Sequence, residues 1–151
     1  MNIRVRRANA ADHAVLVEYN RRMAWETERK HLDDGVLSCG VSNALADAAK
    51  GFYLVAESDG TVVGQLMITS EWSDWRDGWF WWIQSVYVRE DARRHGVFRA
   101  LYEESVRLAK ETGNVVGLRL YVERENQRAQ RTYESLGMRN AGYFVFEKML
   151  S

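Results

Sequence analysis

The stretch from Gln84 to Tyr102, with the sequence QSVYVREDARRHGVFRALY, indicates the fold more clearly than any other part of the chain. An apolar segment typical of a strand is followed by a basic turn around Gly96 and then by an amphipathic helix. The first N–H groups of a helix have no intrahelical partner and lie at the positive end of the helix dipole. In this order of elements they point outward beside several arginines. The stretch therefore predicts a binding site for a phosphate or pyrophosphate.

Length and composition limit the classes of protein that this chain can belong to. With 151 residues, 46% of them hydrophobic, residues 1–151 are expected to form a single domain with its own core. The 21 basic residues balance the 21 acidic ones, so no general polyanion-binding surface is expected. No segment has the length of a membrane span or the apolar core of a signal peptide, and we expect a cytoplasmic protein. The lone Cys39 excludes an internal disulfide, and the histidines lack metal-ligand spacing with it. We expect no metal.

The N-terminal part of the chain predicts alternating elements. A strand is expected at residues 3–7, and a helix beginning near Asn9 or Asp12 continues toward Met23. Residues 26–50 are expected to be partly helical, with an interruption at residues 33–40. Two strands, at residues 52–57 and 62–70, flank the sequence Ser-Asp-Gly-Thr, which is a strong hairpin signal. A strand at residues 79–88 follows a turn at residues 77–78. Three antiparallel strands should therefore follow one another.

The C-terminal part predicts four further elements. A helix is expected from Val97 to Lys110 with its stop at Gly113, followed by a strand at residues 115–122. A helix at residues 127–136 should end at Gly137, and a strand at residues 143–149 should close the chain. The whole order predicts an α/β fold around one sheet.

Two motifs together resemble the GCN5-related N-acetyltransferase (GNAT) family. The sequence Arg-Arg-His-Gly-Val-Phe at residues 93–98 is similar to the Arg/Gln-x-x-Gly-x-Gly/Ala turn of that family, with Phe98 as a departure. Asn126, Ala129, Tyr133 and the pair Gly137-Met138 match a second family motif. The motifs GxGxxG and GxxxxGK[ST] are absent, which argues against a dinucleotide fold and an NTPase phosphate loop. The resemblance covers nearly the whole chain and implies a mixed, mostly antiparallel sheet flanked by helices.

The resemblance also implies a ligand. In this family the acyl donor is acetyl-CoA, whose pyrophosphate would bind the N–H groups of residues 94–99. Its pantetheine arm would pair with the backbone of residues 86–88, and the thioester would lie near the side chains of the second motif. The implied binding residues are Val86, Tyr87, Val88, Arg93, Arg94, His95, Gly96, Val97, Phe98, Arg99, Asn126 and Tyr133.

Acetyl transfer to an amine needs a proton acceptor and a proton donor. The amine must lose a proton before it can attack, and the departing thiolate gains from a nearby acid. The resemblance assigns the acid to Tyr133, whose phenol is mostly protonated at pH 7. The family's usual glutamate corresponds to Gln84, which cannot accept a proton and can only orient a water or the substrate. Other candidate bases are Glu26, Glu28, Glu71 and Glu123. We prefer Glu28, then Glu71, and a water chain is the remaining alternative.

Five of the six tryptophans fall within residues 72–82. Strand alternation predicts Trp79 and Trp81 on one face and Trp82 on the other, so that one set is core while the second borders a pocket or a subunit contact in a homodimer. Contacts to the acceptor are expected from Trp82, Gln84 and Glu28. The acceptor is a small-molecule or peptide amine, and neither nucleic acid nor a membrane is an expected partner.

Two other classes of function compete with an acetyltransferase. A non-catalytic acyl-CoA sensor or interaction domain would keep the phosphate site without a base, as Gln84 suggests. A single-strand nucleic-acid binder would use the basic turn and stack bases on the tryptophans, but the balanced charge disfavours it.

Overall fold

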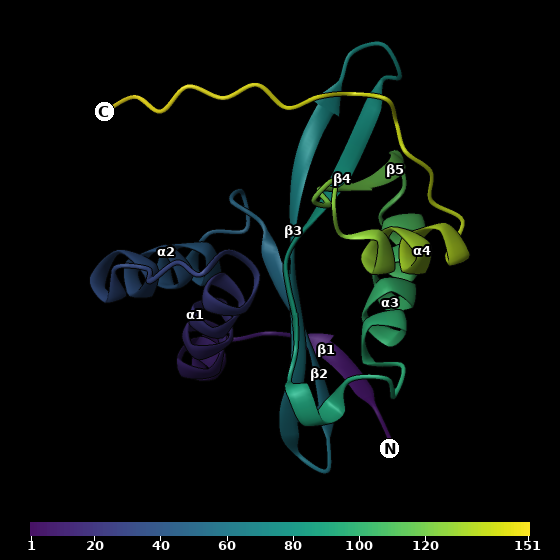
Figure 1. Ribbon diagram of the computed structural model, residues 1–151. Helices are drawn as coiled ribbons and strands as arrows, with labels where there is room; N and C mark the ends of the chain where they lie inside the picture. The colour runs from purple at the N-terminus through teal and green to yellow at the C-terminus, as the bar shows by residue number, and fades with distance from the viewer. The chain divides into compact units, whose positions relative to one another are not determined.

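One five-stranded sheet organises the computed structural model, which describes residues 1–151 (Figure 1). Its order is β1-β2-β3-β4-β5; the pairs from β1 to β4 are antiparallel, and β5 is parallel to β4. The strands are β1 (Arg4–Arg7), β2 (Phe52–Ser58), β3 (Thr61–Ser73), β4 (Gly78–Val88) and β5 (Val115–Leu120). The predicted α/β class with a mixed, mostly antiparallel sheet is confirmed.

The hairpin between β2 and β3 has the predicted turn. Ser58 pairs with Thr61, and the two residues between them have positive φ angles, 51° at Asp59 and 77° at Gly60. This backbone shape matches the twist of the flanking strands, and Asp-Gly is a sequence that adopts it at low cost. The three consecutive antiparallel strands are confirmed.

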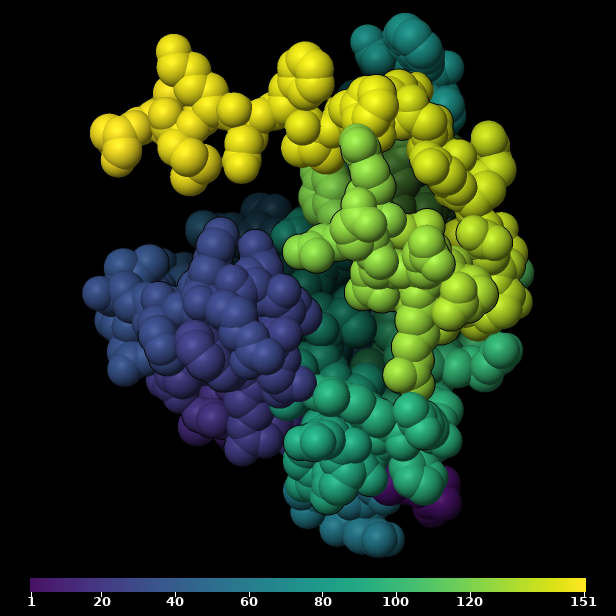
Figure 2. All heavy atoms as spheres, viewed as in Figure 1, coloured from purple at the N-terminus to yellow at the C-terminus, as the bar shows by residue number.

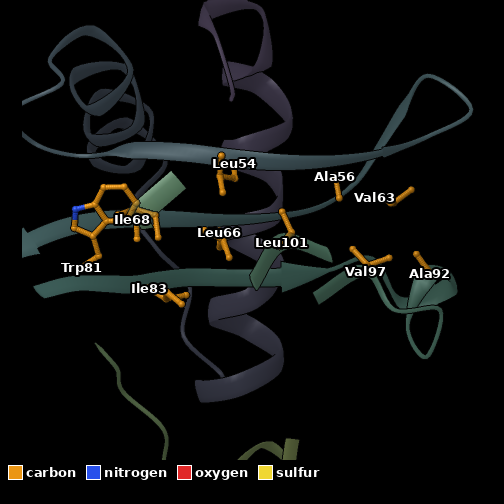
Figure 3. Packing of buried hydrophobic residues seen from close by; sticks show 11 residues of the cluster. Leu54, Ala56, Val63, Leu66, Ile68, Trp81, Ile83, Ala92, Val97 and Leu101 are labelled. Atoms are coloured by element: carbon orange, nitrogen blue, oxygen red, sulfur yellow. The ribbon is translucent and has the colours of Figure 1, made fainter. Parts of the chain in front are cut away.

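Helices cover both faces of the sheet. In Figure 1, α1 (His13–Glu28) and α2 (Asp34–Ala46) lie on one face, and α3 (Val97–Thr112) lies on the other. The core on the α3 face includes Leu54, Leu66, Ile83 and Leu101, which are at most 2% exposed (Figure 3). A second cluster joins α1 and α2 to β2 through Leu16, Val41, Tyr53 and Val55. No helix has the length and apolarity needed to cross a membrane.

The position of the break between α1 and α2 differs from the prediction. The chain leaves the helical conformation at Arg29, whose φ is 54°, and not at residues 33–40. The Asp33 carboxylate accepts a hydrogen bond from the Val36 N–H at 2.9 Å, so this aspartate begins α2 as its N-cap. The helix then continues through Gly35 and Gly40 because Val41 and Ala44 are buried in a hydrophobic cluster with residues of β2. Tertiary packing here outweighs local propensity.

An ion pair fixes the entry to α1. Asp12 closes a capping box with Asn9 and accepts two hydrogen bonds from Arg6, at 2.8 and 2.9 Å. Arg6 also hydrogen-bonds Glu57 on β2. The Arg6 hydrogen bonds hold the pKa of the Asp12 carboxyl below its usual value of 3.8. A short 3-10 turn (Ala10–Asp12) thereby becomes tied to β1.

The Asp12→Asn variant should lose about 2 kcal/mol of unfolding free energy at pH 7, because charged hydrogen bonds to Arg6 disappear. A carboxyl whose pKa is depressed by folding stabilises the protein above the unfolded pKa and loses this effect as pH falls through the folded pKa. The difference between variant and wild type should therefore shrink below pH 3.8. Urea denaturation of both proteins at several pH values measures this difference in unfolding free energy. Glu111→Gln, which removes an exposed pair with Arg107, serves as control and should leave the unfolding free energy almost unchanged at every pH.

The chain forms two compact units, Met1–Leu120 and Tyr121–Ser151. A single domain over residues 1–151 therefore stays a prediction. The second unit contains α4 (Gln127–Ser135), close to the predicted helix, and Gly137 follows it with a φ of 91°.

The predicted strand at residues 143–149 is wrong. Residues 138–151 have no regular secondary structure, although Tyr143, Phe144, Val145 and Phe146 form an apolar run. Apolar β-propensity alone therefore does not make a strand here.

Candidate functional site

The turn before α3 presents unpaired N–H groups. Arg94 and Gly96 both have left-handed backbone conformations, with φ angles of 67° and 80°. Gly96 is the N-cap of α3, and no side chain caps the helix. A Cβ atom built on Gly96 would meet nothing within 4 Å, so the space above the turn is open. Alternating backbone handedness of this kind directs successive N–H groups into a concave surface that binds anions.

Packing of the first turn of α3 explains how the chain accommodates Phe98 at a position where the similar motif has Gly or Ala. Val97 is 2% exposed in the core, and Phe98 is half-buried and packs against the same cluster. The Phe98 ring lies 6.2 Å from the Tyr102 ring on the next turn. The larger side chain is therefore accommodated by the core.

Arg93 is turned away from the open side of the turn. Its Nε donates to the Val88 carbonyl at 2.9 Å, and its Nη2 donates to Glu26 Oε1 at 2.6 Å. The Tyr87 hydroxyl donates to the other oxygen of Glu26, also at 2.6 Å. These contacts tie α1 to the end of β4 and to the turn. The Arg93 guanidinium is thus bonded to the protein, and the predicted contact of Arg93 with the acyl donor stays a prediction.

The contacts of Glu26 also determine its charge. Burial by itself raises the pKa of this carboxyl, but the hydrogen bonds from Tyr87 and Arg93 outweigh that effect and hold the pKa below its usual value. For Tyr87, burial is the largest cause that raises the pKa, and the bond to Glu26 adds to it. Glu26 is therefore a carboxylate and Tyr87 a phenol at neutral pH, and Glu26 is a poor proton acceptor.

An open cavity of about 670 Å³ adjoins this cluster. Its walls come from α1, from the end of β4 and from the segment that follows β4, and they include Arg22, Glu26, Tyr87, Arg89, Glu90 and Asp91. In Figure 2 the blue-purple surface of α1 and α2 lies beside the teal surface of the chain around the start of α3. Charges of both signs line the cavity, which favours a polar ligand.

The edge of β4 opens at the same end of the sheet. The parallel ladder with β5 ends at the pair Ile83–Leu120, whereas β4 continues to Val88. Beyond Ile83 the side of β4 that faces away from β3 has no neighbouring strand. Backbone groups on this side of residues 84–88 can thus receive an extended ligand, as in β-strand addition, except for the Ser85 and Val88 carbonyls, which accept hydrogen bonds from Gln65 and Arg93.

A β-bulge interrupts β4 at the start of this open edge. Gln65 pairs with Tyr87 and Met67 pairs with Gln84, so two residues of β4, Ser85 and Val86, lie opposite the single residue between them on β3. Ser85 has a φ of 51°, which is rare for a residue with a side chain.

The β4 residues predicted to contact the acceptor amine lie on the sheet face covered by α1 and α2. Gln84 donates from its amide to the Thr69 hydroxyl, and the Trp82 indole donates to Glu71 Oε1 at 3.2 Å. Arg119 donates to the same Glu71 oxygen at 3.2 Å and lies over the Phe80 ring. The structure therefore brings Glu71 and Trp82 together, two residues from Gln84. Glu28 lies at the end of α1, where it pairs with Lys30 at 3.4 Å and not with Gln84.

The tryptophans divide between core and surface, but not by face as predicted, because Trp79 is 37% exposed although it alternates onto the face of the buried Trp81. Trp81 is buried against the Phe52 ring, with centroids 5.5 Å apart, on the α3 face. Trp82 faces the other side with Glu71. Near the hairpin end, Trp72 and Trp79 stack edge to face at 5.0 Å and are partly exposed, and Trp75 is 87% exposed.

The second motif can be described within the C-terminal unit. The side-chain oxygen Oδ1 of Asn126 accepts a hydrogen bond from the Ala129 N–H at 3.1 Å and so caps α4. Burial raises the pKa of the Tyr133 phenol. Tyr133 is therefore protonated at neutral pH, as an acid must be before it acts.

The sequence analysis predicted neither the buried position of Gln65 nor the bulge at Ser85. Gln65 is the one polar side chain within the apolar run VVGQLMI of β3, and it is fully buried. A lone polar residue in an apolar strand is a usable signal, because such a group is normally buried only with a hydrogen-bond partner.

Comparison with known proteins identifies the relatives of this chain. Residues 12–138 match the acetyltransferase (GNAT) family. No curated protein sequence matches the chain. The crystal structure of a "possible acetyltransferase" from Clostridium difficile 630 is 44% identical, with a TM-score of 0.92 over 100% of this chain and 99% of that one.

Two more distant structures share the fold. A predicted acetyltransferase from Clostridium acetobutylicum, solved with acetyl-CoA, is 18% identical with a TM-score of 0.79, covering 99% of this chain and 97% of that one. An aminoglycoside N-acetyltransferase in complex with CoA is 17% identical with a TM-score of 0.78, covering 99% of this chain and 96% of that one. From the family match and the 44% identical structure, we conclude that the chain belongs to the GNAT acetyltransferase family.

Proposed function

We propose that this protein transfers an acetyl group from acetyl-CoA to a primary amine by direct attack in a ternary complex. The observation that carries the proposal is the combination of an uncapped, glycine-initiated helix with an open strand edge at the end of β4. A diphosphate joined to an extended amide-containing arm has the chemistry that fits both features.

In this proposal the turn and β4 hold the acyl donor. N–H groups of residues 94–99 bind the pyrophosphate, and the exposed Arg94, His95 and Arg99 surround it. Backbone groups of residues 86–88 bind the pantetheine arm. Arg93 contributes indirectly, because its guanidinium is bonded to Glu26 and to the Val88 carbonyl. The bound donor supplies an activated thioester.

Proton transfers complete the reaction. The phenol of Tyr133 protonates the departing thiolate, and its raised pKa supports the protonated form that this role needs. Of the two carboxylates preferred among the four candidate bases, Glu71 has more support than Glu28, because it contacts Trp82 on the face that Gln84 shares. A water chain is the remaining path for the amine proton.

The acceptor is a small-molecule or peptide amine. Fold neighbours solved with acetyl-CoA or CoA support the choice of donor. One of them acts on an aminoglycoside, and at 17% identity this acceptor does not transfer to the present chain. Trp82, on the face that Gln84 shares, favours an acceptor with an apolar or cationic body.

A non-catalytic acyl-CoA sensor is the second candidate. It is favoured by Gln84, which replaces the usual glutamate and donates its amide to Thr69. The decisive experiment combines calorimetry with CoA and thiol release from acetyl-CoA in the presence of an amine panel. We expect micromolar CoA binding and amine-dependent thiol release. Binding without turnover across polyamines, amino acids, aminoglycosides and peptides would favour the sensor, and absence of CoA binding would refute both functions.

A further inference from the structure

Gln65 is the most unusual buried residue of the molecule. Its side chain is fully inaccessible, and its Oε1 is the only buried side-chain polar atom without a hydrogen-bond partner. Its Nε2 donates to the Ser85 carbonyl at 2.9 Å. Leaving a buried acceptor unpaired is unfavourable, so an apolar residue of the same shape would be expected at this position on stability grounds alone. The single bond to Ser85 therefore calls for a reason other than stability.

The bonded carbonyl belongs to the extra residue of the bulge. Ser85 has a φ of 51°, and the residues on either side of the bulge resume regular pairing with β3. A left-handed conformation is costly for a residue with a Cβ atom and persists only where its surroundings enforce it. The Gln65 amide, held in a fully packed site, provides that enforcement through the Ser85 carbonyl.

The bulge changes which side chains face α1. In a regular strand Gln84 and Tyr87, three residues apart, would point to opposite faces of the sheet. Here both point to the α1 and α2 face, because Gln84 bonds Thr69 and Tyr87 bonds Glu26. The extra residue also lies where β4 loses its β5 neighbour, so it sets the direction of the backbone groups that follow.

We propose that Gln65 is a positioning residue, which locks the Ser85 bulge and thereby sets the direction of the backbone groups of residues 86 and 87 that face the acyl donor. Its role in activity rests on the proposed function, whereas its effect on the bulge does not. Gln65 touches neither the donor nor the acceptor in this scheme, and it acts only through Ser85.

Gln65→Met tests the proposal, because methionine has a similar shape and lacks the amide donor. We expect a melting temperature within about 4 °C of wild type, because the lost bond is offset by removal of the unpaired oxygen. We also expect acetyl-CoA KM to rise at least about tenfold. Ser105→Ala is the matched control, since Ser105 is equally buried and donates to the Leu101 carbonyl within α3. It should leave KM unchanged.

A double-mutant cycle with Ser85→Gly makes the test specific. Glycine adopts a positive φ without strain, so the bulge should need less support in that background. Gln65→Met should then raise KM by less than about threefold, and the coupling between the two sites should be clear in the cycle. If Gln65→Met raises KM equally in the wild-type protein and in the Ser85→Gly variant, the proposal is overturned.

Amide hydrogen exchange measures the effect of Gln65 on the bulge independently of any effect on activity. Gln65→Met should speed exchange at residues 84–88 and leave β2 unaffected, whether or not the protein is an acetyltransferase. If the wild-type protein neither binds CoA nor releases thiol, the proposed function is refuted. The exchange measurement still tests whether Gln65 stabilises the bulge. Unchanged exchange at residues 84–88 would refute the role of Gln65 even in an active enzyme.

Discussion

Gly96→Asp should abolish CoA binding, with at least about a 100-fold loss of affinity, equivalent to about 3 kcal/mol. Two effects add at this position. Gly96 has a φ of 80°, which a residue with a side chain adopts only with strain. The new carboxylate would also stand at the positive end of α3, where the diphosphate is proposed to bind, and would repel it. Calorimetric titration with CoA measures the change directly.

A control for this variant is available in the β2–β3 turn. Gly60 has a φ of 77°, and a Cβ atom there also meets nothing within 4 Å. Gly60→Asp therefore introduces the same strain and the same charge away from the site, and it should lower the melting temperature while leaving CoA affinity intact. Gly96→Ala should give an intermediate loss, because it brings strain without charge. If Gly96→Asp binds CoA within about threefold of wild type, the turn is not the diphosphate site.

The parts of this site that the sequence predicted are those governed by local chemistry. Asp59-Gly60 makes a tight turn because its own backbone preferences select that shape, and Gly96 begins α3 because glycine adopts a positive φ readily. The strand, turn and helix around residue 96 follow from a pattern of fewer than 20 residues. Such features need no knowledge of distant contacts.

Features that depend on distant partners were not predictable in this way. The sequence pattern did not show that the Arg93 guanidinium reaches Glu26, which is 67 residues away in the chain. The preference for Glu28 over Glu26 could not anticipate which carboxylate meets Tyr87. The bulge at Ser85 depends on the register between β3 and β4, which no local pattern encodes. Residues 143–149 carry a strand pattern but have no regular secondary structure.

Tyr133→Phe should lower kcat about 100-fold and leave CoA affinity within about twofold of wild type. The phenol is proposed to donate its proton to the thiolate as the carbon–sulfur bond breaks, and phenylalanine keeps the ring while removing the proton. Burial raises the pKa of Tyr133, so the wild-type enzyme should keep this acid protonated up to alkaline pH. Steady-state kinetics from pH 6 to about 10 should show no fall of wild-type kcat from deprotonation of this phenol.

Tyr53→Phe is the control that separates acid catalysis from the loss of a buried hydroxyl. Burial raises the pKa of Tyr53 as well, and this residue packs between β2 and the helices α1 and α2. Removing its hydroxyl should alter stability slightly and leave kcat and its pH profile unchanged. Equal losses of kcat in the two variants would assign the effect to packing. Unchanged turnover in Tyr133→Phe would instead mean that the thiolate leaves without this acid, and the proton would then have to come from water.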